Sequence, residues 1–483
     1  MTEATFSHLT DTSRLRSFHL KDEVLDAIAE HANVAQFVSF DPGLKQRRCR
    51  LFGKKRNYRF PSPLEAVSQL LECSPERKVN VRTFGLGDLR SSDFITGLTR
   101  SDEVVNALVQ FSTRGLYTIV NESVDVKDGG VSGVSFGNIV EFCPGETPRC
   151  VEYADIASFP RQQGLELLKR VYGFKPKLDY APHMRIEFSI HPAKRGFARD
   201  HTIIWEIDEA EPQKLPNRIR WPNSFSRHLG DKLFGLVLAD VLGFAVPSTL
   251  ALPRRLPPFK FGRPTGASSG VVWMRTCPAT KAPGKFATVR GWADPFAIMQ
   301  ADDRTGELIS SIIVQDEVEA QYSGAFLSSE SGYPLIEGIL GTGESLMLGT
   351  EGPDNLPKNI TRDVQTLYDS VNPVVGPVRV EWVHDGRCTW IVQLQQESSS
   401  GTEDIIVPAE QESTQYVEFN VGDGLPKLRE LIDSLAGKGK GVILKGHVGL
   451  TSHLADVLRE ARIPSKRVRI QQGESQMRMD FPA

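Results

Sequence analysis

The sequence contains few cysteines, and they are not grouped. The six cysteines among its 483 residues are Cys49, Cys73, Cys143, Cys150, Cys277 and Cys388. None of them belongs to a CxxC pair, which argues against both a disulfide framework and a cysteine-ligated metal cluster. The spacing therefore predicts reduced cysteines.

Long apolar runs and an excess of one charge are also missing. No stretch of 18 apolar residues occurs, and segment 1–14 lacks the apolar core of a signal peptide. The net charge of −3 indicates neither an anionic membrane nor a nucleic acid as a partner. We therefore expect a cytoplasmic protein without a membrane partner, and nucleic acid stays an open but weakly supported partner.

The composition is otherwise that of a globular protein. Apolar residues make up 40% and charged residues 24% of the chain, which is enough to bury a large core. At a usual ~150 residues per domain, the length predicts roughly three domains.

Three short patterns occur twice in the chain in the same order. Strand-like segments 79–83, 131–134 and 185–188 resemble 271–276, 322–325 and 379–382. The spacing from Arg82 to Glu187 is 105 residues and that from Arg275 to Glu381 is 106, so the patterns stay in register. The sequence predicts two related units at 1–207 and 208–397, a linker at 398–413 and a small domain at 414–483.

Apolar periodicity predicts mixed helices and strands. Residues 229–241 carry a helical apolar stripe, while 312–314 and the pair within 378–394 are strand-like. In the last segment we expect a helix at 425–435, a strand at 441–444 and a helix at about 452–462. The predicted class is α/β, in the broad sense that includes α+β.

A phosphate-binding pattern follows the strand at 271–277. The strand carries Arg275, and the loop after it contains Gly284 and Thr288. A guanidinium supplies charge, glycine allows close backbone approach and a threonine hydroxyl adds a hydrogen bond. Lys232 begins a predicted helix, where the helix dipole already favours an anion. Each feature alone is also typical of an ordinary loop or a solvated lysine.

A hairpin pairs Glu381 with Gln393. Both side chains can ligate a hard cation, provided that they share one face of the hairpin. A two-residue turn would place the two side chains on opposite faces of the hairpin, so this hypothesis requires a three-residue loop at 385–387. The alternative is a surface hairpin with an exposed glutamate.

Taken together, these motifs resemble a known family. The ordered set of Gly-Asp-Lys, strand arginine, Pro-Gly-x-x-x-Thr, Val-Gln, Ser-Gly, Gly-x-Gly-Glu and Glu/Gln is similar to the ATP-binding domain of pyruvate phosphate dikinase, phosphoenolpyruvate synthase and rifamycin phosphotransferase. The similarity covers roughly 225–397. It implies an ATP-grasp fold that uses ATP and Mg²⁺. One departure is Gln395, where the family has arginine.

The resemblance also implies roles for individual residues. It places Lys232, Arg275, Gly284 and Thr288 on the phosphates, and Gln315 near the adenine. It places Glu381 and Gln393 at magnesium.

The C-terminal segment resembles the phosphohistidine segment of the same family. Thr451-Ser452-His453 precedes a predicted helix that ends at Ile463-Pro464. Ser452 would cap the helix, and His453 in its first turn would carry a phosphoryl group as catalytic residue in a swivelling domain. Leu454 and Asp456 depart from the small residues of the family. The alternative is a helix histidine without a catalytic role.

The first unit looks degenerate by comparison. When the two units are aligned in register, Ser92 and Thr96 correspond to Gly284 and Thr288, and Glu206 corresponds to Gln393. This unit could bind the acceptor, bind nucleotide weakly or only brace the second unit. Its basic run 45–56, with seven positive charges, is either a solvated hairpin or a patch for a phosphorylated or nucleic acid partner.

Three functions stay open at this point. The first is a dikinase-like phosphotransferase that passes a phosphoryl group from ATP through His453 to an unknown acceptor. The second is an ATP-binding sensor without turnover, and the third is an ATP-grasp ligase that forms an acyl phosphate. The sequence does not indicate whether AMP or ADP is the product, or what the oligomeric state is.

Overall fold

The computed structural model describes the chain as two compact units. The described residues are 20–85, 93–146, 155–181, 183–209, 219, 221–280, 286, 288–328, 333–397, 404–409 and 415–468. Unit 1 comprises Met1–His228 with Leu252–Phe259, and unit 2 comprises Leu229–Ala251 with Lys260–Ala483. Among the described residues, none of the helices has the length and apolar character needed to cross a bilayer.

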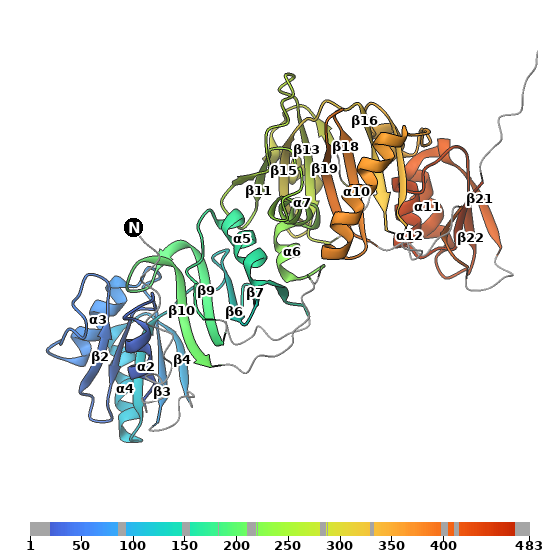
Figure 1. The fold of residues 1–483 in the computed structure, drawn as a ribbon. Helices are drawn as coiled ribbons and strands as arrows, with labels where there is room; N and C mark the ends of the chain where they lie inside the picture. Colours follow the sequence, from blue (N-terminus) through green and yellow to red (C-terminus); the bar gives the residue numbers. More distant parts are fainter. Residues whose placement is uncertain are drawn as a thin grey trace, which may run out of the picture. The chain divides into compact units, whose positions relative to one another are not determined.

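Unit 1 contains two antiparallel sheets (Figure 1). The first has the order β2-β1-β5-β3-β4, made of β1 (Phe37–Phe40), β2 (Gln46–Arg50), β3 (Val79–Phe84), β4 (Phe94–Leu98) and β5 (Tyr117–Glu122). The second has the order β10-β9-β6-β7-β8, made of β6 (Val131–Phe136), β7 (Ile139–Pro144), β8 (Ala157–Pro160), β9 (Met184–Arg195) and β10 (Asp200–Glu209). The helices are α2 (Lys21–Ile28), α3 (Pro63–Cys73), α4 (Ser101–Thr113), α5 (Arg161–Tyr172) and α6 (Ser224–Leu229). The apolar faces of α3 and α4 pack on the first sheet and close its core.

Unit 2 begins with two further antiparallel sheets. The first has the order β12-β11-β15-β13-β14, made of β11 (Thr249–Pro253), β12 (Phe259–Phe261), β13 (Val272–Pro278), β14 (Thr288–Arg290) and β15 (Ile309–Asp316). The second has the order β17-β16-β18-β19, made of β16 (Tyr322–Leu327), β17 (Leu335–Leu340), β18 (Val378–His384) and β19 (Thr389–Gln396). The helices are α7 (Asp231–Val241), α8 (Pro295–Asp302), α9 (Glu344–Leu348) and α10 (Lys358–Val375). The predicted helix at 229–241 and the strands at 312–314 and 378–394 are confirmed.

A smaller sheet ends unit 2, with the order β20-β23-β22-β21. It consists of β20 (Ile405–Val407), β21 (Tyr416–Asn420), β22 (Gly441–Lys445) and β23 (Ser465–Val468), with η3 (Val421–Asp423), α11 (Gly424–Leu435) and α12 (His453–Glu460). The predicted helices and strand of this segment are confirmed. Range 398–413, expected to be a linker, contributes β20, which pairs with β23.

The first sheets of the two units have the same strand order. Strands β1 to β5 are arranged as β11 to β15 are, and β6, β7, β9 and β10 as β16, β17, β18 and β19. Arg82 pairs with Ile119 on the neighbouring strand, as Arg275 pairs with Ile313. The mixed class is confirmed, and because nearly all pairings are antiparallel it is α+β.

The hairpin β18–β19 differs from its prediction. Its loop has four residues, 385–388, and not three. That loop alone would place Glu381 opposite Val392, but a bulge between Glu381 and Trp382 shifts the register. Glu381 therefore lies directly opposite Gln393, on the same face, because the bulge inserts one extra residue into β19.

A glycine positions the start of α7. Gly230 has φ of +92°, and a Cβ there would lie 2.6 Å from the carbonyl oxygen of Cys277. Glycine alone fits both the left-handed backbone and the close approach. The first turn of α7, which carries Lys232, is thereby packed against β13.

Candidate active site in unit 2

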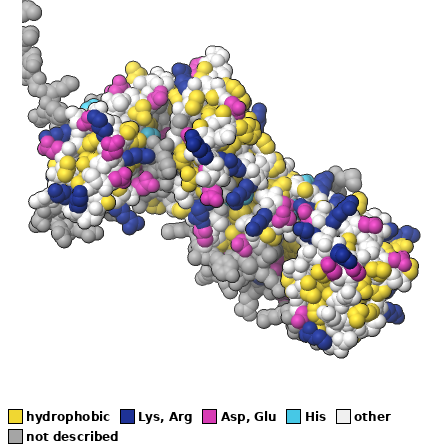
Figure 2. Space-filling view, turned by 180° about the vertical axis from the view of Figure 1, so that it is seen from behind, with side chains coloured by type: hydrophobic (Ala, Val, Ile, Leu, Met, Phe, Trp, Pro, Cys, Tyr) yellow, Lys and Arg dark blue, Asp and Glu magenta, His cyan; other side chains and the backbone are white. Residues whose placement is uncertain are grey.

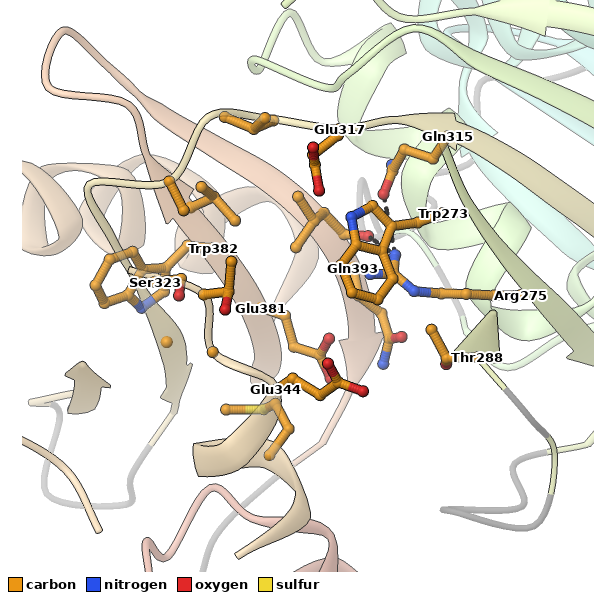
Figure 3. Close-up of a pocket in the computed structure, with 18 of the residues that line it drawn as sticks. Trp273, Arg275, Thr288, Gln315, Glu317, Ser323, Glu344, Glu381, Trp382 and Gln393 are labelled. Carbon is orange, nitrogen blue, oxygen red and sulfur yellow. Dashed lines mark hydrogen bonds between the residues drawn. The ribbon is translucent and has the colours of Figure 1, made fainter. Parts of the chain in front are cut away.

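One cavity in unit 2 brings together most of the predicted site residues. It has a volume of about 330 Å³ and lies between the sheets that contain β13 and β18 (Figure 3). Seven of the eight predicted residues line it: Lys232, Arg275, Thr288, Gln315, Glu381, Gln393 and His453. Gly284 lies outside the described residues. The roles of these residues stay predictions, but the structure places their side chains around one space.

The cationic side of the cavity is formed by Arg275 and Lys232. Arg275 donates from Nη1 to Gln315 Oε1 (3.0 Å) and to the carbonyl oxygen of Val392 (3.1 Å). Thr288 is its direct partner on β14. Lys232 makes no hydrogen bond or ion pair with any described residue.

Burial lowers the pKa of both cations below their ordinary values. A buried cation without a full counter-charge is costly, and a bound anion would offset that cost. This side of the cavity is therefore suited to phosphate.

The opposite side carries an ionised carboxylate. Burial raises the pKa of Glu381, but Arg379, Arg275 and His453 together outweigh burial and hold it below its ordinary value. Arg379 Nη2 lies 3.6 Å from Glu381 Oε1. Glu381 is thus a charged carboxylate that lines the cavity.

A chain of amides orients Gln393. Its Nε2 donates to Gln395 Oε1 (3.0 Å), and Gln395 Nε2 donates to Asp231 Oδ2 (3.2 Å). The side-chain oxygen Oε1 of Gln393 accepts no hydrogen bond from a described residue, which leaves it available to a ligand. Gln395, the departure from the family pattern, thus orients the amide of Gln393.

The donor set fits Mg²⁺. No group of three His, Cys, Asp or Glu side chains suited to a metal occurs in the described part of the chain. Magnesium usually takes one or two protein oxygens and completes its octahedron with phosphate and water. Glu381 and Gln393 would supply those two oxygens.

A third part of the cavity wall adjoins the cationic side, because Arg275 contacts both Gln315 and Val392. Residues 315–318, from the end of β15 toward β16, line it together with Trp273, Phe286, Trp382 and Val392. Glu317 is fixed by Arg290 at 2.9 Å. Apolar and aromatic walls with a few polar side chains are typical of sites for small organic ligands.

His453 reaches the same cavity from α12. Ser452 caps this helix by accepting from Ala455 N, as predicted. His453 Nδ1 lies 3.4 Å from Asp456 Oδ2, and its Nε2 makes no hydrogen bond to a described residue. Asp456 is buried and pairs with Arg379 and Arg459, so it is held ionised.

Asp456 and Arg379 are functional candidates that the sequence interpretation missed. Asp456 was regarded only as a departure from the family. Its spacing of three residues from His453 was the available signal, because residues i and i+3 share a helix face. Nothing in the sequence connected Arg379 to α12.

Unit 1 departs from its predicted register. Arg82 pairs with Phe94 on β4, as Arg275 pairs with Thr288 on β14. Phe94, and not Thr96, therefore occupies the position of Thr288. Ser92 lies outside the described residues.

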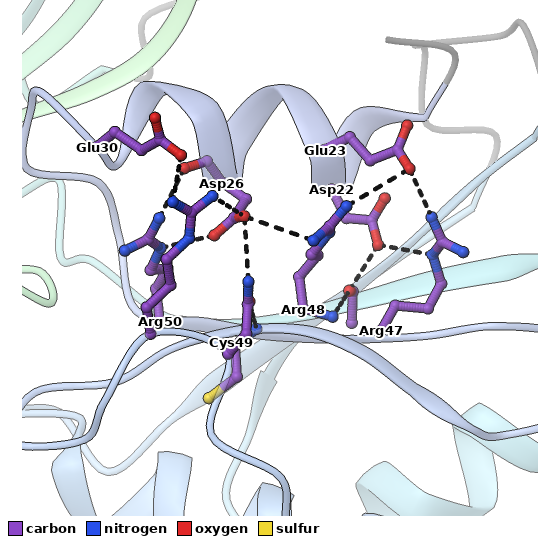
Figure 4. Close-up of polar contacts among 11 residues, drawn as sticks. Asp22, Glu23, Asp26, Glu30, Arg47, Arg48, Cys49 and Arg50 are labelled. Atoms are coloured by element: carbon purple, nitrogen blue, oxygen red, sulfur yellow. Dashed lines mark hydrogen bonds and ion pairs between the residues drawn. The ribbon is translucent and has the colours of Figure 1, made fainter.

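The basic run of unit 1 packs against α2 (Figure 4). Arg47 pairs with Asp22 at 2.9 Å, and Asp26 pairs with Arg50 at 2.7 Å and with Arg56 at 2.8 Å. On the face in Figure 2, basic side chains are interspersed with acidic ones. These pairs favour the hairpin interpretation over a patch for a phosphorylated or nucleic acid partner.

Comparison with known proteins gives structural likeness only. No family model matches the chain, and no curated protein matches it. Similar solved structures include the D-cycloserine synthetase DcsG, with 16% identity over 42% of this chain and 66% of that one, and a TM-score of 0.25. D-alanyl-alanine synthetase A from Vibrio cholerae has 11% identity over 35% and 55%, with a TM-score of 0.24. The macrocyclase MdnC from Microcystis aeruginosa has 10% identity over 48% and 85%, with a TM-score of 0.21.

The chain thus spans 66% and 55% of the first two of these structures. At these TM-scores the likeness assigns no function, which is inferred instead from the site itself.

Proposed function

We propose that unit 2 is an ATP-dependent enzyme that binds magnesium and ATP in the cavity between its sheets. The observation that carries this proposal is the pair of poorly compensated cations, Lys232 and Arg275, facing an ionised Glu381 across one cavity. A triphosphate with its metal complements both sides at once. The resemblance to dikinase ATP-binding domains supports the same ligand.

Each lining group has a task in this proposal. Lys232, Arg275 and Thr288 bind phosphate oxygens, and Gly284 would allow close approach of its loop. Gln315 and the neighbouring residues 316–318, which line the same cavity, would face the base. Bound magnesium would neutralise charge on the β- and γ-phosphates.

We propose His453 as the phosphoryl acceptor. With Nδ1–H donated to Asp456, the lone pair of Nε2 is free to attack phosphorus. The new N–P bond forms as the P–O bond to the nucleotide breaks, and the nucleotide leaves with that electron pair. The product is ADP if the γ-phosphorus is attacked. Asp456 acts here as a positioning residue.

A ligase is the second candidate. The groups for ATP and metal are complete without His453, and Ser323, Thr342 and Glu344 line a further part of the wall. A substrate carboxylate bound there would take the γ-phosphoryl group and become an acyl phosphate. His453 would then be a structural residue.

Labelling with γ-³²P-ATP and magnesium separates these candidates. We expect label on the protein that is stable in base and labile in acid, as phosphohistidine is, and absent from His453→Ala. Asp456→Asn should reduce the labelling rate about tenfold or more while ATP binding persists. A His453→Ala protein that labels like the parent would contradict the histidine step.

Product analysis completes the experiment. AMP with inorganic phosphate would indicate dikinase chemistry, and ADP released only when a carboxylate and an amine are supplied would indicate the ligase. ATP binding without any product would indicate a sensor.

A further inference from the structure

Unit 1 contains a second cavity at the sheet positions that form the site in unit 2. Its volume is about 300 Å³, close to that of the first. The residues that line it include Lys21, Arg82, Asn121, Glu187, Trp205 and Glu206.

The polar pairs of the two cavities correspond by strand register. Arg82 Nε donates to Asn121 Oδ1 at 3.2 Å, as Arg275 donates to Gln315. Asn121 has the position of Gln315. Asn121 pairs with Asn80, two residues before Arg82, and Gln315 pairs with Trp273, two residues before Arg275. The cation and the amide that orients it are therefore present in both units.

The metal-side pair corresponds as well. Glu187 lies directly opposite Glu206, and a bulge at Trp205 produces this register, as the bulge at Val392 does in unit 2. Two opposed carboxylates are stronger ligands for a divalent cation than Glu and Gln. Arg185 Nη1 lies 2.7 Å from Glu187 Oε1, in the position that Arg379 has beside Glu381.

An aromatic ring is fixed at the wall of the cavity. Trp205 Nε1 donates to Ser189 Oγ at 2.8 Å. His191 contacts the same oxygen through Nε2 (2.8 Å) and Asp128 Oδ2 through Nδ1 (2.9 Å). An indole held in one orientation offers a face on which a base can stack.

We propose that this cavity is a second magnesium–adenine nucleotide site, which binds its ligand without transferring a phosphoryl group. The ligand class rests on the proposed function of unit 2. Transfer is disfavoured because both nitrogens of His191, the histidine among the described lining residues, are already engaged. Phe94 also replaces the hydroxyl of Thr288.

Binding stoichiometry tests this proposal. Calorimetry of the full chain with magnesium and the β,γ-imido analogue of ATP should give two sites. Arg275→Ala should weaken one site and Arg82→Ala the other, each at least tenfold, and the double variant should lose both. One site that is insensitive to Arg82→Ala would overturn the inference. A single site that Arg82→Ala weakens and Arg275→Ala leaves unchanged would contradict only the proposed function of unit 2.

Two further measurements do not depend on the folding of the arginine variants. Photolabelling of the native protein with 8-azido-ATP should modify peptides from 117–136 or 200–209 as well as peptides from unit 2. Phe94 is 54% exposed, so Phe94→Thr should leave unit 1 folded and should tighten the unit 1 site severalfold. Labels confined to unit 2, with no effect of Phe94→Thr, would exclude the second site.

Discussion

The two cavities share an architecture but differ in the state of their lysines and histidines. In unit 2, Lys232 has no partner among the described residues, and His453 has one nitrogen available. In unit 1, Lys21 is already engaged, and His191 is hydrogen-bonded through both nitrogens. The comparison teaches that the arginine–amide pair and the bulged hairpin are kept in both units although the groups around them differ. Under the proposed function, we expect these few side chains to decide whether a bound nucleotide is used.

The largest expected difference between the units is at their hairpin carboxylates. Glu381→Gln should abolish turnover, because removing the charged ligand forfeits several kcal/mol of metal-assisted stabilisation. Glu187→Gln is the matched variant in unit 1 and should reduce turnover far less. Steady-state assays of both proteins, with circular dichroism as a folding control, check this. Equal losses would mean that both hairpins serve one reaction.

Acid should destabilise unit 1 before unit 2. Burial, helped by Arg255, lowers the pKa of His228 to about 4 from an ordinary 6.5. Between these values the unfolded state binds the proton and the folded state does not, so stability falls as the pH drops from 6.5 toward 4. The loss is at most about 3 kcal/mol.

Hydrogen exchange of unit 1 peptides between pH 7 and pH 4.5, corrected for intrinsic rates, measures this loss. His228→Gln should flatten the dependence. An unchanged pH dependence in that variant would assign the acid sensitivity to other groups.

Replacing a cation that is proposed to bind phosphate should weaken ATP binding only in the unit that carries it. Arg275→Ala and Lys232→Ala should each weaken ATP binding at unit 2 by about 1.5–3 kcal/mol, the range for hydrogen bonds to charged groups. Arg82→Ala should leave the affinity of the unit 2 site nearly unchanged. Titration calorimetry checks all three, and equal losses at unit 2 from Arg82→Ala and Arg275→Ala would remove the distinction between the cavities.

The smallest effect concerns two helix caps. Ser452 caps α12 and Ser62 caps α3, each through its hydroxyl. Replacing either by alanine should cost about 1 kcal/mol of stability. Only Ser452→Ala should also slow phosphoryl labelling, because it loosens the turn that holds His453. Chemical denaturation and the labelling assay together test this. Equal labelling by both variants would show that the Ser452 cap has no role in phosphoryl labelling.

Much of unit 2 could be predicted because its signals are local. Apolar periodicity predicted the helix at Lys232 and the strands around Arg275 and Gln315. The order of the motifs, which resembles that of dikinase ATP-binding domains, assigned these elements to one site. The bulge at Val392 could not be foreseen, since no residue pattern specifies where an extra residue enters a ladder. The shift from Thr96 to Phe94 has a similar origin in the pairing of β3 with β4. The Asp456–Arg379 pair joins residues 77 positions apart, which only tertiary structure reveals.

The central claim is that unit 2 holds magnesium and ATP between the sheets that contain β13 and β18. A crystal structure with magnesium and the β,γ-imido analogue of ATP tests it most directly. We predict phosphates on Lys232 and Arg275, the base beside residues 315–318 and the metal on Glu381. An empty unit 2 cavity at saturating nucleotide, or phosphates directed away from Arg275, would contradict the account.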